Sequence, residues 1–355
     1  MNSSAIIEQF KPSDKPNLLA FLSKAYPDNP RQSDEAFWNW HFPGSPYWNT
    51  DDPPFWLAKV DGQIAGQLGA VPVELNVAGV AQQAIWILDL IVDPDFRRRG
   101  IAKKLALASM DHCPFVLGVN TPKQHAPKML VGLGWTIFAK IPRYQKILFP
   151  GNASRDIAKF KAVASAVNAA FAPIRTGYPT WPNVKRVESF DRSFDELWAE
   201  ARGQWKCSVS RSSQMLDWQF CRQPGKKFEI LACEENGRLR GYVVMFFRKP
   251  NQYGVIEKVA ITDICYAPEA ADETITMLLD EAAKLAIERK VGSIVTDAID
   301  ERVERLLKHA GFWKVKSDLQ LLAKVPEDQQ IVYNAENWYL TRADSDISIF
   351  EAPNM

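Results

Sequence analysis

The sequence predicts a mixed α/β fold that occurs twice within one chain of 355 residues. Three observations support this prediction. Apolar, strand-like runs alternate with segments of helical periodicity, as they do in α/β proteins. Asp61-Gly62 and Asn236-Gly237 each join two β-rich runs and signal a tight hairpin. The order of elements in the first half then recurs in the second half, which indicates an internal duplication.

The duplication rests on five pairs of landmark residues. Their offsets lie between 174 and 178 residues, and a chance match would not hold so constant a spacing. The pairs are Trp40 with Trp218, Gly62 with Gly237, Gly66 with Gly241, Asp89 with Asp263, and Gly134 with Gly311. We therefore predict two copies of one domain, roughly at residues 1–150 and 186–325.

Each element of the first copy follows from its local pattern. The runs around Asp61-Gly62 predict an antiparallel hairpin, and the apolar run at 84–92 is typical of a strand buried on both faces. Apolar residues at helical spacing then predict a helix from Gly100. A second buried strand at 115–119, a short helix, a Gly-aromatic pair and one last strand at 136–148 complete the copy.

The remaining segments connect or follow the copies. Residues 151–185 form the linker, with an Ala-rich middle that favours a helix and a Pro-rich end that favours an extended chain. Residues 326–355 form a polar tail, which we expect to lie against a domain surface.

Composition narrows the class of protein. Hydrophobic residues make up 46% of the chain, enough for packed cores, and 43 Lys and Arg balance 42 Asp and Glu. This neutrality argues against a nucleic-acid or membrane-surface partner. The five cysteines form no CxxC pair, so we expect no metal site and no disulfide framework. With no signal peptide or apolar span visible, we expect a cytoplasmic protein.

Three consecutive arginines mark the start of the first helix after the buried strand. In "VDPDFRRRGIA", Pro94 ends the strand, because proline cannot donate to a sheet. Gly100 then begins a helix, whose free N–H groups and positive dipole end favour a phosphate. Ala102 keeps this face open, and Arg97, Arg98 and Arg99 add positive charge. The pattern predicts a turn that binds a diphosphate.

This turn resembles motif A of the GCN5-related N-acetyltransferase (GNAT) family, Val-x-Pro-x-x-Arg-x-x-Gly-x-Gly/Ala. The matching positions are Val92, Pro94, Arg97, Gly100 and Ala102. The resemblance covers residues 55–140, including "GLGW" at 132–135, and implies two tandem GNAT-like acyl-CoA N-acyltransferase domains. It further implies acetyl-CoA as cosubstrate, held by the residues Leu90, Ile91, Val92, Arg97, Arg98, Arg99, Gly100, Ile101, Ala102 and Asn120. His125, soon after Asn120, is a further polar candidate for lining the pocket.

The second copy departs from this motif. Where the arginines and Gly100 should recur, "YAPEAADETITMLL" places Glu269, Asp272 and Glu273 and no glycine. Acidic side chains at a helix start satisfy its dipole and repel a pyrophosphate. We therefore expect the C-terminal copy to be degenerate and to bind no acetyl-CoA at this turn.

The acid and base of the family are not where the resemblance would place them. Leu130 stands where a tyrosine acid is frequent, and Leu88 where a glutamate base is frequent. Asp89, beside Leu88, is one candidate base, although Asp263 in the degenerate copy favours a structural role for this position. Glu74 and His41 are other polar candidates, and Tyr144 on the last strand is an alternative acid.

The sequence thus predicts an N-acetyltransferase in which the amine of a small or medium-sized acceptor attacks the thioester directly. Two alternatives remain open. One is a transferase of aminoacyl or longer acyl groups to cell-wall or amino-sugar precursors. The other is a non-catalytic acyl-CoA-binding module, which the missing glutamate and tyrosine would permit.

Overall fold

The computed structural model describes residues 4–122 and 126–344, which form two compact units. The first unit contains the chain up to Lys140 together with Arg222–Gly225 and Asp318–Asn337. The second unit contains Ile141–Cys221, Lys226–Ser317 and the chain from Trp338 onwards. Neither unit is a continuous stretch of sequence.

A mixed sheet with helices on both faces forms the first unit. Its strands follow the order β1-β2-β3-β4-β5-β15-β6, in which β4 and β5 run parallel and the other described neighbours antiparallel. Its principal helices and strands are β1 (Ile6–Gln9), α1 (Lys15–Ala25), α2 (Glu35–His41), β2 (Phe55–Val60), β3 (Gln63–Val77), β4 (Val80–Val92), α3 (Ile101–His112), β5 (Val116–Asn120), α4 (Ala126–Val131), β6 (Thr136–Lys140) and β15 (Gln320–Lys324).

Strand β2 shows why these strands are apolar throughout. Phe55 and Leu57 pack in one cluster with residues of α1 and α2, whereas Trp56 and Ala58 pack in another with Leu105 of α3. Successive residues of a strand point to opposite faces, so a sheet covered on both faces needs apolar residues at every position. The buried strands that the apolar runs predict are confirmed.

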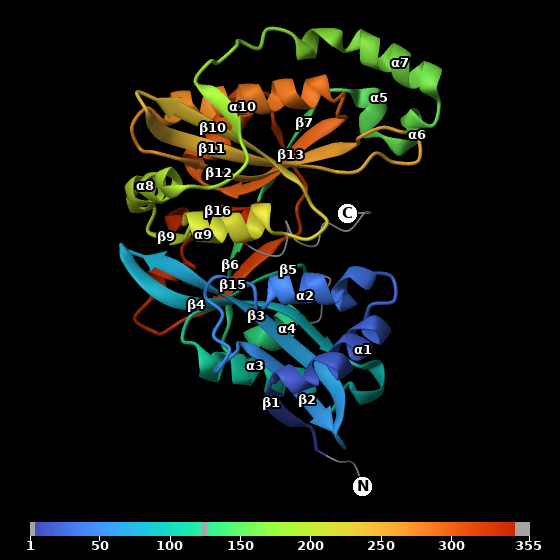
Figure 1. The fold of residues 1–355 in the computed structure, drawn as a ribbon, viewed down its shortest axis with the longest axis vertical. Helices are drawn as coiled ribbons and strands as arrows, with labels where there is room; N and C mark the ends of the chain where they lie inside the picture. Colours follow the sequence, from blue (N-terminus) through green and yellow to red (C-terminus); the bar gives the residue numbers. More distant parts are fainter. Residues whose placement is uncertain (1–3, 123–125, 345–355) are drawn as a thin grey trace. The chain divides into compact units, whose positions relative to one another are not determined.

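The second unit repeats this order of elements (Figure 1). Its sheet runs β8-β10-β11-β12-β13-β7-β14, with β12 and β13 as a parallel pair. Its principal helices and strands are β7 (Arg143–Ile147), β8 (Val184–Val187), α8 (Arg192–Ala201), β9 (Cys207–Val209), α9 (Ser213–Leu216), β10 (Phe228–Glu235), β11 (Arg238–Phe247), β12 (Lys258–Tyr266), α10 (Ala271–Glu288), β13 (Ser293–Ile299), α11 (Glu301–His309), β14 (Trp313–Val315) and β16 (Trp338–Thr341).

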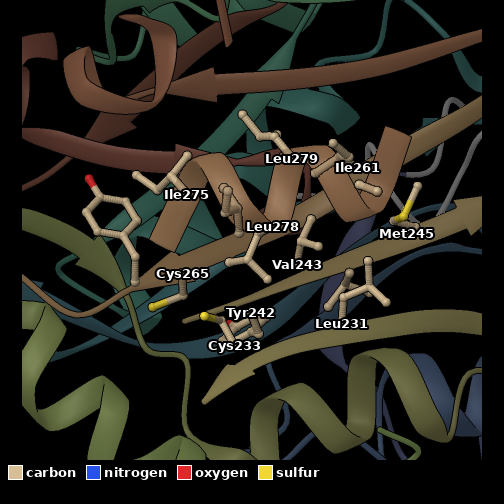
Figure 2. Packing of buried hydrophobic residues seen from close by; sticks show 14 of the residues in the cluster. Leu231, Cys233, Tyr242, Val243, Met245, Ile261, Cys265, Ile275, Leu278 and Leu279 are labelled. Carbon is tan, nitrogen blue, oxygen red and sulfur yellow. The ribbon is translucent and has the colours of Figure 1, made fainter. Parts of the chain in front are cut away.

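One part of the core of the second unit lies between α10 and the sheet. Figure 2 shows Ile275 and Leu278 of α10 beside Val243 of β11 and Ile261 of β12, and all four side chains are buried. None of the described helices is long and apolar enough to cross a membrane.

Both hairpin turns have the geometry that the dipeptides predict. Asp61 and Gly62 have φ values of 48° and 79°, and Asn236 and Gly237 have values of 52° and 74°. Two successive positive φ angles define a type I′ turn, which matches the twist of the strands it joins. The two hairpin predictions are confirmed.

A pair of equivalent glycines shows how closely the copies agree. A Cβ at Gly66 would lie 2.8 Å from the main-chain oxygen of Ile91, and a Cβ at Gly241 would lie 2.8 Å from that of Cys265. Ile91 and Cys265 are themselves equivalent in the repeat. Each glycine therefore permits the same close approach of two strands, and the two tandem copies of one fold are confirmed.

The copies exchange a strand, which the sequence analysis did not anticipate. The single last strand expected at 136–148 is wrong, because Pro142 lacks an N–H and divides it into β6 and β7. β7 pairs with β13 and β14 of the second unit, and β15 fills the corresponding place between β5 and β6 of the first. The boundary between the units thus falls within the predicted strand.

The helix expected in the Ala-rich middle of the linker is confirmed, whereas the tail is more ordered than expected. The Ala-rich linker contains α7 (Lys161–Ala170), preceded by the short helices α5 (Pro150–Ala153) and α6 (Arg155–Ala158). In the tail, strand β16 is buried within the second unit, where we expected a surface segment. Of the tail, the structure describes residues 326–344.

Candidate functional site

The two parallel strands of the first unit part from each other partway along their length. β4 and β5 pair through Ile85–Val116 and Trp86–Leu117, although β4 runs on to Val92 and β5 to Asn120. Beyond Trp86 the facing edges of these strands form no further pairs in the described register. An extended ligand with amide groups is suited to such an opening, because it can bond to the edge of a strand.

Strand β4 carries a bulge inside this opening. Gly69 pairs with Leu88 and Gln67 with Ile91, so β4 has one residue more than β3 in this interval. Asp89 has a φ of 52°, a conformation that is costly for any residue with a Cβ. A bulge turns main-chain groups out of the regular ladder, so it offers N–H groups to a ligand in the opening.

The carboxylate of Asp93 stabilises the turn after β4. Asp93 is buried, and it accepts hydrogen bonds from the main-chain N–H of Asp95 at 3.0 Å and from Lys24 at 2.9 Å. The hydrogen bond from Lys24 lowers the pKa of Asp93, and the bond from Asp95 lowers it further. The 3-10 helix Pro94–Phe96 then directs the chain toward α3.

The start of α3 leaves its main-chain donors available. Gly100 precedes the helix with a φ of 74°, and no side chain of the described residues caps this end. Arg98 is also left-handed, with a φ of 62°. The first four N–H groups of a helix have no partner within it, and alternating backbone handedness gathers N–H groups into an anion-binding concavity.

Two of the three arginines brace the turn. Arg97 donates from Nε to the main-chain oxygen of Val92 at 3.1 Å. Arg99 donates to the main-chain oxygen of Asp95 at 3.2 Å, and its guanidinium lies 5.1 Å from the ring centre of Phe96. All three arginines are exposed, so their charge faces solvent around the helix start.

The structure brings most of the predicted cofactor residues to one place. Leu90, Ile91 and Val92 are half-buried on the end of β4 that no longer pairs with β5, and Asn120 is half-buried on the facing end of β5. Ala102 is half-buried in the first turn of α3, whereas the Ile101 side chain packs in the core. Ile101 can therefore contribute only main-chain groups. His125 lies outside the described residues.

The predicted catalytic residues are not brought together. Asp89 lies at the bulge and is half-buried. Glu74 pairs with Gln83, six residues along β4 from Asp89. At about 3.3 Å per residue the two carboxylates lie roughly 20 Å apart along the strand, too far to share one reaction centre.

Tyr144 and His41, the other two candidates, are both fully buried. Tyr144 lies on β7 in the second unit, fully buried, and its hydroxyl donates to Glu304. Burial and the Glu304 carboxylate raise its pKa. His41 is fully buried in the first unit, and burial, together with the charge of Arg31, lowers its pKa to about 3.

Gln67 is a site residue that the sequence analysis missed. It lies on β3 beside the bulge, is buried, and its Nε2 is 3.5 Å from the main-chain oxygen of Asp89. Its Oε1 is buried without a hydrogen-bond partner among the described residues. A polar residue within the otherwise apolar run at 64–73 was the available signal, because a buried amide needs partners.

The second unit has a different helix start. The acidic residues there bind cations of their own unit: Asp272 contacts Arg302 at 3.3 Å and Arg305 at 2.8 Å, and Glu269 contacts Arg240 at 3.1 Å. The arrangement is the reverse of the first unit, where cations surround the helix start.

Comparisons with known proteins agree with this geometry. The sequence of residues 16–121, which spans α1 to the end of β5, matches the acetyltransferase (GNAT) family. No curated protein matches the sequence.

Solved structures resemble the fold over nearly the whole chain. N-myristoyltransferase of Saccharomyces cerevisiae with bound myristoyl-CoA aligns with a TM-score of 0.60 at 12% identity, over 91% of this chain and 83% of that one. A probable N-acyltransferase of Enterococcus faecalis aligns with a TM-score of 0.63 at 14% identity, over 93% and 74% of the chains. A GCN5-related N-acetyltransferase of Anabaena variabilis aligns with a TM-score of 0.62 at 12% identity, over 93% and 75%.

Identities this low establish a shared fold, and the family match in the first unit adds the motif at the start of α3. Residues 16–121 therefore match the GNAT family, and the chain as a whole has the fold of the solved acyltransferases.

Proposed function

We propose that the protein is an acyl-CoA-dependent N-acyltransferase that transfers an acetyl group to the amine of a small or medium-sized acceptor. The first unit would bind one acyl-CoA per chain, with the pyrophosphate at the start of α3. The pantetheine arm would then lie between β4 and β5, against the main chain of Leu90–Val92. The structure of the solved relative with myristoyl-CoA supports an acyl-CoA donor in this fold.

The coincidence of two features in the first unit is the observation on which this proposal rests. The opening between β4 and β5 leads toward the uncapped helix start at Gly100. The first feature suits an extended amide arm and the second suits a phosphate, and coenzyme A contains both groups in one molecule.

The bulge at Asp89 suggests how acyl transfer would proceed. A main-chain N–H turned out of the ladder would donate to the thioester oxygen and stabilise the charge that develops there. The amine nitrogen would bond to the acyl carbon, the carbon–sulfur bond would break, and the departing thiolate would gain a proton. Asp89 is the candidate to accept the amine proton, either directly or through water.

The position of the acidic helix start supports a single site per chain. Asp272 and Glu269 in the second unit would repel the pyrophosphate that Gly100 and the arginines would attract. The free thiols of all five cysteines support a reducing compartment, and we propose the cytoplasm.

Acyl-CoA binding can be tested with two matched glycine variants. Gly100 and Gly237 both have a φ of 74°, and a Cβ at either would meet no described atom within 4 Å. Gly100→Ala and Gly237→Ala should therefore cost similar stability. We expect only Gly100→Ala to lose the stabilisation by acetyl-CoA, measured as a shift in melting temperature. For the unchanged protein at a hundred times Kd, this stabilisation is about 2.7 kcal/mol of unfolding free energy. Equal shifts in all three proteins would refute binding of the pyrophosphate at the start of α3.

Turnover separates an enzyme from a binding module. Release of free thiol from acetyl-CoA should require an amine, and a series of acyl-CoAs from acetyl to myristoyl would establish the preferred chain length. Binding without thiol release across a library of amines, amino sugars and peptides would instead support a non-catalytic module.

A further inference from the structure

The second unit has the same parting of parallel strands as the first. β12 and β13 pair through Lys258–Ser293, Val259–Ile294 and Ala260–Val295 and then diverge. Val259 and Ala260 are the repeat equivalents of Ile85 and Trp86, where the pairing of β4 with β5 ends. The opening therefore begins at the same point in both copies.

A segment of the chain itself lies in the opening of the second unit. We call Trp338–Asp344, which consists of β16 and the 3-10 helix after it, the closing segment. Thr341 pairs with Ala298 and Leu340 with Ile299 on the diverging end of β13. Thr341 Oγ1 also donates to Asp263 of β12 at 2.7 Å, so the segment is bonded to both strands that border the opening.

Buried charges hold the closing segment at the β12 side. Asp263, the repeat equivalent of Asp89, accepts from Tyr242 at 2.7 Å and pairs with Arg211 at 3.2 Å. Arg211 in turn pairs with Asp344 of the closing segment at 2.6 Å. These side chains are almost fully buried, and a charge in such a place is tolerated only when it is paired.

A second carboxylate holds the segment at the β13 side. Asp297 is fully buried and pairs with Arg143 at 2.8 Å and with Arg342 of the closing segment. Its repeat equivalent in the first unit is Val119, which carries no charge. The second opening thus has one carboxylate on each strand, and the closing segment supplies partners to both.

The aromatic contacts of the closing segment are equally close. Tyr339 stacks on Trp205 with ring centres 3.9 Å apart, and Gln219 donates to the main-chain oxygen of Ala343 at 2.6 Å. Trp338, Tyr339 and Leu340 are buried. The packing is that of a core strand.

We propose that the closing segment is an internal peptide ligand of the second unit, seated in the opening that the first unit leaves for the acyl-CoA arm. The opening of the second unit is therefore a peptide-binding site, specific for an extended strand that ends in Thr and is followed by a helical turn of sequence Arg-x-Asp. The comparison with acyl-CoA rests on the proposed function of the first unit, whereas the seating of the segment does not.

Hydrogen exchange on the full-length protein tests the seating. The amides of 338–341 should exchange as slowly as those of β13 in the absence of any ligand. Asp263→Asn should speed their exchange at least tenfold, whereas the matched change Asp89→Asn in the first unit should leave them unaltered. Thr341→Val, which keeps the side-chain shape and removes the bridging hydroxyl, should act in the same direction if Asp263→Asn fails to fold. Unaltered exchange at 338–341 in the folded variant would overturn the proposal.

Acetyl-CoA provides the second arm of this experiment. Saturating acetyl-CoA should leave exchange at 338–344 unchanged, because the closing segment keeps its place. Faster exchange there would mean that the ligand displaces the segment, and would overturn its assignment as a resident ligand. If β4 shows no protection by acetyl-CoA, the proposed function fails while the ligand-free comparison of Asp263→Asn with Asp89→Asn still decides the seating.

Discussion

Arg97 donates from its Nε to the main-chain oxygen of Val92, 3.1 Å away, and so ties the helix turn to the end of β4. The bond leaves the two terminal nitrogens of the guanidinium for an anion. Arg97→Ala removes both the brace and the charge, and we expect the Kd for coenzyme A to rise roughly 10- to 100-fold, the value of a hydrogen bond to a charged group. Calorimetry at low and moderate salt measures this change.

Arg192 supplies the control for Arg97. Arg192 is exposed and pairs with Glu196, one turn away on the same helix, at 3.3 Å in the second unit. Arg192→Ala should leave the affinity within about twofold, since exposed pairs contribute little. A similar loss in both variants would show that net charge, and not the turn, governs binding.

The equivalent glycines Gly66 and Gly241 predict a separation of stability from binding. A Cβ at either position would collide with a main-chain oxygen at 2.8 Å, so Gly66→Ala and Gly241→Ala should each cost about 1–3 kcal/mol of unfolding free energy. Only Gly66 pairs with Val92 at the binding end of β4. We therefore expect Gly66→Ala alone to weaken acyl-CoA binding, as measured by calorimetry below the unfolding temperature. Binding unchanged in both variants would place the cofactor elsewhere.

Gln67 and its repeat equivalent Tyr242 predict an effect on the rate. Gln67 contacts the main chain of Asp89 at the bulge, whereas Tyr242 contacts the side chain of Asp263. In Gln67→Met the bulge loses this contact, and we expect kcat to fall about tenfold with KM for acyl-CoA nearly constant, as for loss of a transition-state interaction. Steady-state kinetics on Gln67→Met measures both constants.

Tyr242→Phe serves as the structural counterpart of Gln67→Met. It should lower stability because Asp263 loses one of its buried hydrogen bonds, and it should leave kcat unaltered at a temperature where the protein is folded. A rise in KM for acyl-CoA with kcat unchanged in Gln67→Met would argue that Gln67 shapes the opening and does not position the bulge.

His41 predicts a loss of stability in mild acid. Its pKa is about 3 in the folded protein, against 6.5 for an exposed histidine, so the unfolded chain binds the proton more readily. The contribution of this residue to the unfolding free energy is complete above about pH 6.5. As the pH drops below that value the contribution decreases, by roughly 2 kcal/mol at pH 5. Urea unfolding of the unchanged protein and of His41→Gln at several pH values isolates the effect. Parallel pH curves for the two proteins would show that His41 does not titrate on unfolding.

The sequence was sufficient for those parts of the site that depend on local backbone chemistry. Gly100 and Pro94 act through their own conformational limits, so the turn and the helix start follow from their order along the chain. The repeat likewise follows from residues, such as Gly66 and Gly241, that each copy needs for the same close contact.

The parts that sequence reasoning missed depend on partners distant in the chain. Tyr144 looked like a residue of the first copy, but Pro142 sends its strand into the second sheet. Gln67 acts across a strand pair, and the bulge opposite it shows only in the pairing register. The closing segment has the composition of a polar tail, because the carboxylates that pair with its buried charges lie far away in the sequence. Arg342, for example, pairs with Asp297.

The exchange of β7 and β15 between the sheets has a consequence for how the protein can be made. During synthesis the first sheet lacks the strand between β5 and β6 until residues 320–324 have left the ribosome. Until then, the edge of β5 that pairs with β15 is unpaired in the nascent chain, and unpaired strand edges promote association with other chains. Neither half can therefore be expressed alone as a complete domain, because dividing the chain at the linker would leave the first sheet without β15 and the second sheet without β7.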